Sequence, residues 1–330
     1  MKLKLQQSTS QMCASLRGKT DRQNRILNPH EKAVRKALNN WQLYLMLLPA
    51  VIYILLFKYR PMYGLQIAFR NFNFKDGITG SEWVGFANFV RLFKSYWFPV
   101  TVKNTLTLSF LSLILAFPFP IIFALLLNEV RSKKFKSLVQ TVSYAPHFIS
   151  VVVICGMLLL FMNPDGGLFN VIIKFFGGEK YSMAVDPKAF KWYYVLSDVW
   201  QNCGWNAIIY FAALAGVDNS LLEAAELDGA SRLQRIWHIN LPVLIPTIVI
   251  QLILACGRVL SVGYEKVLLL QNALNLSASE VISTYVYKVG LESYDYSFST
   301  ANSIFNSVVN LILLIAVNFI TKKLTKESLW

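Results

Sequence analysis

The stretch that decides the fold is Leu221-Leu222-Glu223-Ala224-Ala225-Glu226-Leu227-Asp228-Gly229-Ala230-Ser231-Arg232, which runs on to Ile239-Asn240-Leu241-Pro242. Its first half consists of strong helix formers, and Gly229 then supplies the backbone freedom that a tight turn needs. A second short amphipathic stretch follows at 232–239, with apolar residues spaced for one helical face. Pro242 marks the start of the next apolar helix, because a proline at the first helical position loses no hydrogen bond. The sequence therefore predicts helix, glycine turn and helix between two apolar segments.

The spacing within this stretch resembles the cytoplasmic coupling loop of the permease subunits of ABC importers. In that family an EAA triplet is followed by a glycine and, further on, by a hydrophobic residue, any residue, leucine and proline. An EAA triplet alone is only good helix composition. An ordinary helical hairpin between spans, the alternative, does not require the later residues at these spacings. The pattern here is Glu223-Ala224-Ala225, Asp228-Gly229-Ala230 and Ile239-x-Leu241-Pro242.

The composition is that of a membrane protein. Of 330 residues, 55% are hydrophobic, with 23 Phe, 15 Tyr and 8 Trp, which exceeds the share in an ordinary soluble protein. The apolar residues come in blocks of about 18–25, the length that spans a bilayer. In a soluble protein the net charge of +14 would suggest nucleic acid. Here much of the excess lies beside the apolar blocks, where the positive-inside rule accounts for it, so we expect no nucleic-acid partner.

The apolar blocks and the flanking charges predict an all-α integral membrane protein with six transmembrane helices and both termini in the cytoplasm. The resemblance implies that these helices have the ABC importer permease fold. Basic residues at 1–40, at 131–136 and after the last span mark the inner side. This order puts the coupling loop 217–241 in the cytoplasm without use of its motif. Pro118 and Pro120 predict a kink in the second span. The expected spans are 41–57, 104–127, 142–162, 192–216, 242–260 and 301–320.

The expected organisation is a cytoplasmic basic segment at 1–40, a transmembrane permease domain at 41–324 and a cytoplasmic tail at 325–330. Residues 28–40 are either a basic amphipathic helix on the anionic inner leaflet or a flexible tail, and both interpretations stay open. We expect no signal peptide, because no short apolar core with a cleavage site follows the basic lead. The outer loops are expected at 58–103, 163–191 and 261–300.

The sequence lacks the residue patterns of an enzyme. It has no Gly-x-x-x-x-Gly-Lys-Ser/Thr loop for ATP and no Gly-x-Ser-x-Gly elbow. His30, His147 and His238 are far apart, without the spacing of a metal site. We therefore expect transport rather than catalysis, with no metal and no cofactor bound by this chain.

The resemblance to ABC importer permeases implies the partners. ATP and Mg would be bound by two separate cytoplasmic ATPase subunits, whose closure moves the spans between inward- and outward-facing states. A second six-span permease would complete the translocation path. An extracytoplasmic solute-binding lipoprotein would deliver the substrate. The membrane is then the cytoplasmic (inner) membrane of a bacterium.

The same resemblance implies roles within the loop. Glu223 is the acidic contact to a basic residue of the ATPase, while Ala224 and Ala225 allow close helix approach. Gly229 makes the turn, and Asp228 is expected to cap it or to hydrogen-bond across it. The motif is completed, and the loop tied rigidly to the fifth span, by Ile239, Leu241 and Pro242.

Polar side chains in the fourth span predict the substrate path, since such residues are costly in a membrane and usually functional. Amides beside Trp and Tyr suit a sugar, which presents hydroxyls at its edge and C–H groups on its face. Hydrogen bonding between helices is the alternative use of these side chains. Arg258 is expected either to pair with Asp198 or to contact an acidic sugar. The candidate path residues are Asp198, Gln201, Asn202, Trp205, Asn206, Tyr210 and Arg258.

Further stretches, 59–69, 83–89, 269–272 and 280–287, resemble the carbohydrate-uptake branch of the family, in particular permeases that work with lipoprotein-type binding proteins. The predicted function is import of oligosaccharides or polysaccharide fragments. The alternatives are import of another solute, an ion-coupled transporter in which Asp198 and Arg258 form the coupling pair, and a membrane enzyme acting on lipid or glycan. Internal repeats would favour the ion-coupled transporter, and clustered acids or metal ligands would favour the enzyme. Neither pattern is found in the sequence.

Overall fold

The computed structural model describes residues 40–325, with side chains to 323, and the chain divides after Gly64 into two compact units. The smaller unit holds α3 (Trp41–Ile54), a π-turn (Leu55–Tyr59) and the short α4 (Arg60–Met62). The predicted first span, 41–57, lies in this unit. The outer loop expected from residue 58 begins later, because the helical stretch runs on through Tyr63–Phe69. Pro61 does not end it, since it stands in the first turn of α4, where no N–H is needed.

The larger unit is a helical bundle with one short antiparallel pair of strands, β1 (Arg70–Asn71) and β2 (Glu82–Trp83). Its longer helices are α7 (Trp97–Leu115), α8 (Pro118–Asn128), α9 (Lys133–Tyr144), α10 (Val151–Phe161), α12 (Pro187–Leu214), α15 (Leu241–Cys256) and α19 (Tyr296–Thr325). The shorter ones are α5 (Gly77–Gly80), α6 (Ala87–Lys94), α11 (Leu168–Phe175), α13 (Asn219–Leu227), α14 (Arg232–Arg235), α16 (Tyr264–Leu270), α17 (Leu276–Ser279) and α18 (Ile282–Tyr287).

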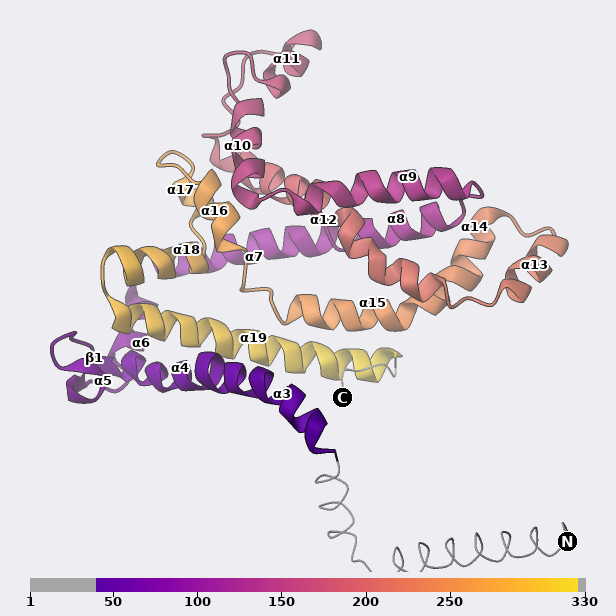
Figure 1. The fold of residues 1–330 in the computed structure, drawn as a ribbon. Coiled ribbons are helices and arrows are strands. Elements are labelled where there is room, and N and C mark those ends of the chain that lie inside the picture. Colours follow the sequence, from indigo (N-terminus) through magenta and orange to yellow (C-terminus); the bar gives the residue numbers. More distant parts are fainter. Residues whose placement is uncertain (1–39, 326–330) are drawn as a thin grey trace, which may run out of the picture. The chain divides into compact units, whose positions relative to one another are not determined.

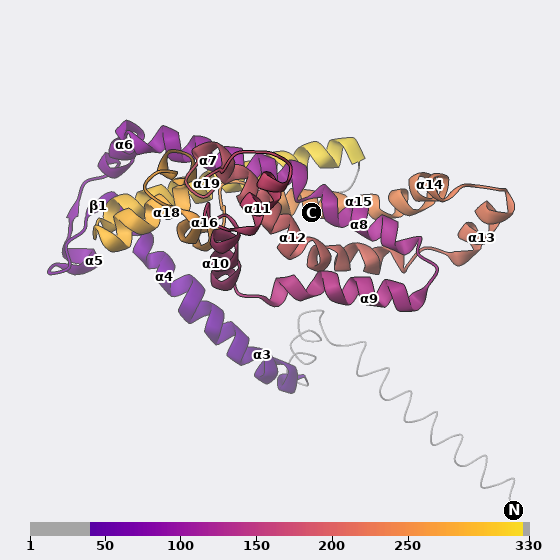
Figure 2. The same ribbon diagram turned by 90° about the horizontal axis from the view of Figure 1, so that it is seen from above.

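The two ends of this bundle are different. Helices α13 and α14 lie at one end, beside the connection between α8 and α9, in both ribbon views (Figure 1 and Figure 2). Helices α17 and α18 lie at the opposite end, and α11 projects from the bundle at the tip of an arm (Figure 1). The segment 217–241 is therefore well separated from the segments 163–191 and 261–300.

Within residues 40–325, four helical stretches are long and apolar enough to cross a membrane, Trp41–Phe69, Trp97–Asn128, Arg232–Cys256 and Tyr296–Lys323. Two bent helix pairs pass the same test together, Lys133–Phe148 with Val151–Phe161 and Pro187–Leu214 with Asn219–Leu227. The described chain thus has four to six candidate spans. The basic segment 1–40 and the tail 325–330 lie outside the described residues, apart from Asn40 and Thr325.

Two predicted spans need correction. The third, 142–162, is not one straight helix, because the chain bends by 96° between Phe148 and Val151. Ser150 is extended there and caps α10 by accepting a hydrogen bond from the Val153 amide, which starts a new helix axis. The predicted fifth span, 242–260, belongs to a helical stretch that begins at Arg232 and ends at Cys256. The second span is interrupted between Leu115 and Pro118, at the predicted prolines.

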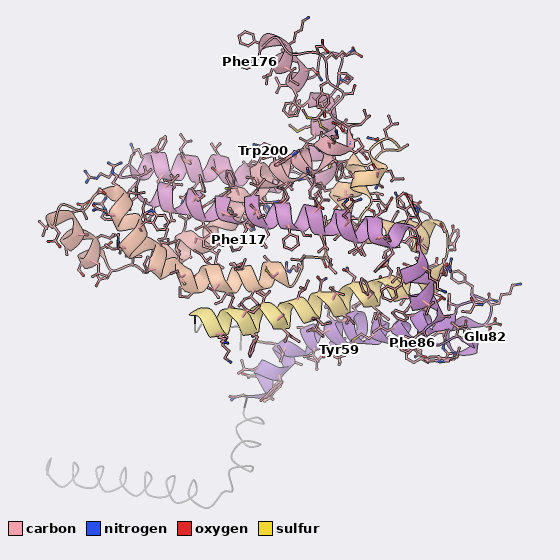
Figure 3. The ribbon with its side chains drawn as sticks, turned by 180° about the vertical axis from the view of Figure 1, so that it is seen from behind. Tyr59, Glu82, Phe86, Phe117, Phe176 and Trp200 are labelled. Carbon is pink, nitrogen blue, oxygen red and sulfur yellow. The ribbon has the colours of Figure 1, made fainter. Side chains whose placement is uncertain are left out.

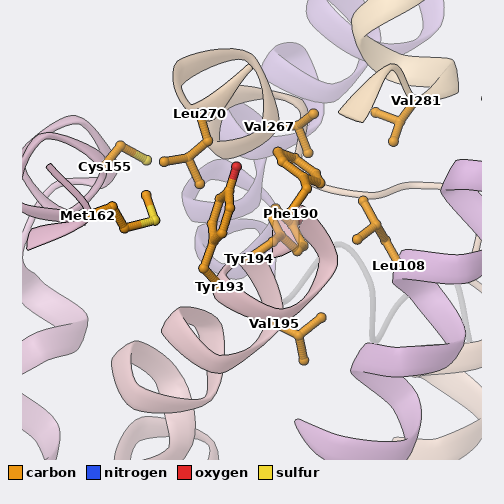
Figure 4. Close-up of a cluster of buried hydrophobic side chains, with 10 residues drawn as sticks. All are labelled: Leu108, Cys155, Met162, Phe190, Tyr193, Tyr194, Val195, Val267, Leu270 and Val281. Carbon is orange, nitrogen blue, oxygen red and sulfur yellow. The ribbon is translucent and has the colours of Figure 1, made fainter. Parts of the chain in front are cut away.

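Helix α12 is the centre of the packing. Its N-terminal half joins α7, α10 and α16 in a cluster of buried apolar side chains, where Tyr193 and Phe190 of α12 meet Leu270 and Val267 of α16 (Figure 4). Its C-terminal half packs on α8 and α15 in a second cluster. At Gly204 a Cβ would lie 2.3 Å from the Ser143 carbonyl oxygen. Only glycine therefore allows α12 and α9 to approach this closely, a use of small residues that is common between membrane helices.

Candidate functional site

Residues 217–241, called the coupling segment below, form a helix, a glycine turn and a second helix, as predicted. Asp218 caps α13 by accepting from the Ser220 amide at 2.9 Å, and this hydrogen bond lowers the pKa of the Asp218 carboxyl. At the other end Gly229 adopts φ +75°. The Ala230 amide donates to the Ala225 carbonyl at 2.9 Å, and the Gly229 amide donates to the Glu226 carbonyl at 3.1 Å. These two hydrogen bonds form a Schellman motif. The sequence thus forms a sharp stop that releases the chain into α14.

Helix α13 has no buried residue, and most of its side chains are exposed. Leu227 is 90% exposed. Glu223 and Ala224 are also exposed, and Ala225 is half-buried. A helix of this length is not stable alone in water, and exposed leucines on a short helix are typical of a surface that a partner covers.

The second helix of the segment is continuous with the span that follows it. Ser231 and Gln234 form a capping box at its start. From Ile236 to Asn240 the helix widens to a π-turn and then runs directly into α15. The sequence predicted a separate helix start at Pro242. Instead the helix continues through Pro242, because the wider π-turn before it accommodates a residue that has no N–H to donate. Leu241 and Pro242 therefore join the segment to α15 through unbroken helix.

Asp228 does not have the predicted role. It lies at the C-terminal end of α13, exposed, and its side chain makes no hydrogen bond to any residue in 40–325. A carboxylate only accepts hydrogen bonds, while the end of a helix presents carbonyl acceptors. The predicted cap or hydrogen bond across the turn is therefore absent, and the Schellman motif closes the turn alone.

A cluster of charged side chains attaches the coupling segment to α8. Arg235, 9% exposed, donates to Glu226 of α13 at 2.5 Å and to Glu129, at the end of α8, at 2.9 Å. The Asn240 amide donates to the other oxygen of Glu129 at 3.0 Å. Arg131 approaches Glu226 at 3.5 Å. One guanidinium thus links α13, α14 and α8, and sequence analysis missed this link entirely.

Helix α8 connects this cluster to two cavities inside the bundle. The cavities have volumes of about 730 and 670 Å³. Both are lined by Ala116 and Phe117, at the break between α7 and α8. Figure 3 shows Phe117 midway along the stretch that α7 and α8 form. The charged cluster therefore lies at the C-terminal end of α8, and the two residues that line both cavities directly precede its N-terminal end.

A chain of polar contacts runs along the larger cavity. His147 Nδ1 lies 2.8 Å from the Asn202 Oδ1, and the Asn202 amide donates to Asp198 at 2.8 Å. The His147 ring stacks on Trp205, with centroids 4.4 Å apart and planes 6° from parallel. Lys266 stands 3.9 Å from Asp198. The wall therefore carries amide, carboxylate, imidazole and aromatic groups in contact with one another.

A family model decides what kind of protein carries this arrangement. Residues 116–326 match the model of the binding-protein-dependent transport system inner membrane component. The chain belongs to this family. It is an ABC transporter permease and an integral membrane protein.

Several relatives share most of their length with this permease. The polygalacturonan/rhamnogalacturonan transport system permease protein YteP of Bacillus subtilis (strain 168) is 46% identical over 89% of this chain and 92% of its own. Protein LplB of the same organism is 43% identical over 87% and 91%. A chain in the crystal structure of a bacterial ABC transporter involved in the import of the acidic polysaccharide alginate is 40% identical. It matches with a TM-score of 0.82 over 89% of this permease and 100% of that chain.

The predicted path residues have different environments in the permease. Asp198, Asn202 and Asn206 line the larger cavity, and Asn206 also lines the smaller one with Trp205. Gln201 also lines the larger cavity, but it is only 6% exposed and its amide donates to the Ile149 carbonyl, which is the contact that the packing alternative expects. Tyr210 is 3% exposed. It belongs to the second core cluster and reaches only the smaller cavity.

His147 and Lys266 of the larger cavity were not among the predicted path residues, and one of the two contacts expected for Arg258 is absent. The sequence treated His147 as an isolated histidine, although its place in an apolar block was a signal of an interior role. Lys266 was placed in an outer loop. Asp198 faces Lys266 instead of Arg258, because α15 ends at Cys256 and Arg258 lies in the turn beyond it. Of the two alternatives for Arg258, the pair with Asp198 is therefore wrong, and contact with an acidic sugar stays a prediction.

Proposed function

We propose that the permease is the transmembrane subunit of an ATP-driven ABC importer for oligosaccharides or polysaccharide fragments. The observation that carries the proposal is the exposed helix α13, which bears the Glu223-Ala224-Ala225 triplet and is fixed by Arg235 to a helix that reaches the interior cavities. The names of the relatives at 46% and 40% identity point to polysaccharide import.

In the proposed topology the permease crosses the cytoplasmic membrane of a bacterium six times, and both of its termini lie in the cytoplasm. Each bent helix pair then counts as one span, with α13 of the second pair leaving the membrane at its 82° bend. The permease domain extends over 41–324, between the basic segment 1–40 and the tail 325–330. In this topology the coupling segment faces the cytoplasm, at the end of the bundle opposite α17 and α18.

The proposed coupling begins at α13. Glu223 contacts a basic residue of the ATPase, while Ala224 and Ala225 let α13 lie close against its partner. Gly229 sets the angle between α13 and α14, and the unbroken helix through Ile239, Leu241 and Pro242 carries the movement into α15. The cluster around Arg235 carries it into α8, and from there to Ala116 and Phe117, which directly precede α8 and line both cavities.

The proposed substrate path follows the two cavities. Asn202, Asn206 and Asp198 offer hydrogen bonds to sugar hydroxyls, and Trp205 with its stacked His147 offers a flat face to sugar C–H groups. The required partners are a second permease of six spans, two ATPase subunits that bind ATP and Mg, and an extracytoplasmic solute-binding lipoprotein. This chain itself binds no cofactor and catalyses no reaction in the proposal.

The ion-coupled alternative gains no support from the interior of the bundle. It requires a coupling pair between Asp198 and Arg258, and these side chains form no ion pair within residues 40–325. Assignment to a binding-protein-dependent family argues in the same direction.

The test is association with the ATPase. The tagged permease and its partner are expressed with the ATPase subunit, and the ATPase retained after purification is quantified. We expect Glu223→Ala to reduce retention and Glu179→Ala, which removes an exposed glutamate far from α13, to leave it unchanged. Purification of the unaltered permease without any ATPase would overturn the proposal.

A further inference from the structure

Arg258 carries a permanent charge that has no ion-pair partner among residues 40–323. It follows α15 in the turn before α16, and it lines both interior cavities. It is exposed, and its guanidinium makes no hydrogen bond or ion pair with any residue in the described part of the chain. Arginine cannot release its proton in a protein, so Arg258 keeps a positive charge in the walls of both cavities.

Lys266 is a second cation in the wall of the larger cavity. It is 7% exposed, and its ammonium makes no hydrogen bond, although it has three donors. It lies 5.3 Å from the centre of the Tyr194 ring and 3.9 Å from Asp198. Burial lowers the pKa of Lys266, and the Asp198 carboxylate opposes this shift. The Asp198 carboxylate therefore only partly offsets the loss of water around the Lys266 ammonium.

The cavity also contains two carboxylates, Asp198 and Glu265. Asp198 is occupied on both sides, since it accepts from Asn202 and faces Lys266. Glu265 is an exposed residue in the first turn of α16, next to Lys266 in the chain. The carbonyl end of α15 offers Arg258 a small favourable field, but the five donors of its guanidinium fork form no hydrogen bond to these carbonyls within residues 40–325. Neither carboxylate therefore neutralises Arg258, which stands where the two cavities meet.

We propose that Arg258 and Lys266 form a carboxylate-binding subsite, through which the permease prefers uronate-containing saccharides over neutral ones. The inference rests on the proposed function, because it concerns the saccharide path. The Arg258 fork matches a carboxylate with two parallel hydrogen bonds. Lys266 adds positive potential from the wall and keeps Asp198 from repelling the ligand. Asn206, which lines both cavities beside Arg258, is placed to bind an adjacent hydroxyl.

The test compares two ligands of one size. The binding of trigalacturonate and of its methyl ester to the complete purified complex is measured by calorimetry, without the solute-binding protein, so that only the membrane complex selects. We expect the unaltered complex to prefer the acid. In Arg258→Gln the ratio of acid to ester affinity should fall about tenfold or more, the scale of a lost hydrogen-bonded charge contact. Arg258→Lys should retain part of the preference.

Two further variants make the result specific. The double variant Lys266→Met with Asp198→Asn removes the wall cation without leaving an unpaired buried charge, and its acid preference should fall. Lys103→Gln removes an exposed charge of α7 outside both cavities and should leave the ratio unchanged. Equal affinities for acid and ester in the unaltered complex would overturn the subsite while the proposed function stands. Binding of neither ligand would count against the saccharide path itself.

Discussion

The cluster around Arg235 makes a quantitative prediction, because its two carboxylates differ in burial. In the pair with Glu129 the side chains are 10% and 12% exposed, whereas Glu226 is 49% exposed. Removal of one partner from a buried ion pair costs about 3–5 kcal/mol. An exposed pair contributes only about 0.2–1 kcal/mol. Glutamine keeps the shape of the side chain and one acceptor oxygen. We therefore expect Glu129→Gln to lower the free energy of unfolding by about 3 kcal/mol and Glu226→Gln to lower it by about 0.5 kcal/mol.

The assay is denaturant unfolding of the solubilised complex, followed by tryptophan fluorescence, with ATP hydrolysis and its stimulation measured on the same preparations. The double variant Glu129→Gln with Arg235→Gln should regain stability, since it leaves no unpaired charge in the buried site. It should not regain stimulation if the charged link transmits movement into α8. Arg131→Gln, which removes a distant and 79% exposed partner, is the matched control. Equal costs for Glu129→Gln and Glu226→Gln would refute the reasoning.

Three further changes test other parts of the account. Gly229→Ala should lower the free energy of unfolding by about 1–2 kcal/mol, because a φ of +75° disfavours an L side chain, and Gly229→Asn should lower it by less. No atom lies within 4 Å of a Cβ at this position, so backbone strain alone sets the expected loss. A much larger loss in unfolding experiments would contradict this explanation. Gly204→Ala should lower the yield of folded protein sharply, since its Cβ would meet the Ser143 carbonyl at 2.3 Å, and size-exclusion chromatography measures this. The pKa of Asp218 is lowered by the Ser220 amide, so its stabilisation of α13 is present above the unfolded value of about 3.9 and is lost as the pH falls through the folded value. The protection of the amides of residues 219–227, which is the intrinsic exchange rate at each pH divided by the observed rate, should therefore fall at acid pH. It should fall less steeply in Asp218→Asn.

The sequence was informative where a local pattern fixes the structure. The helix before Gly229, the turn and the helix after it follow from composition and from one residue with φ above zero. The interruption before Pro118 follows from the missing N–H. These features depend on residues close together in the chain, and short-range propensity describes them well.

Contacts between distant residues could not be predicted in the same way. Arg235 and Glu129 are 106 positions apart, and nothing local to either indicates the other. Lys266 was assigned to a loop because hydropathy does not detect a short helix packed into a cavity wall. The position of Arg258 depended on where α15 ends, and an end of this kind inside an apolar run has no clear sequence signal.

The central claim is that the 218–242 segment couples ATP hydrolysis to saccharide movement through this permease. The most direct measurement is uptake of radiolabelled oligosaccharide into proteoliposomes that contain the complete complex, with binding protein outside. The energy source is either ATP enclosed in the proteoliposomes or an ion gradient across their membrane. The account predicts uptake only with ATP, and its loss in Glu223→Ala although ATP hydrolysis by the complex remains measurable. Uptake driven by an ion gradient without ATP, or unchanged ATP-driven uptake in Glu223→Ala, would contradict it.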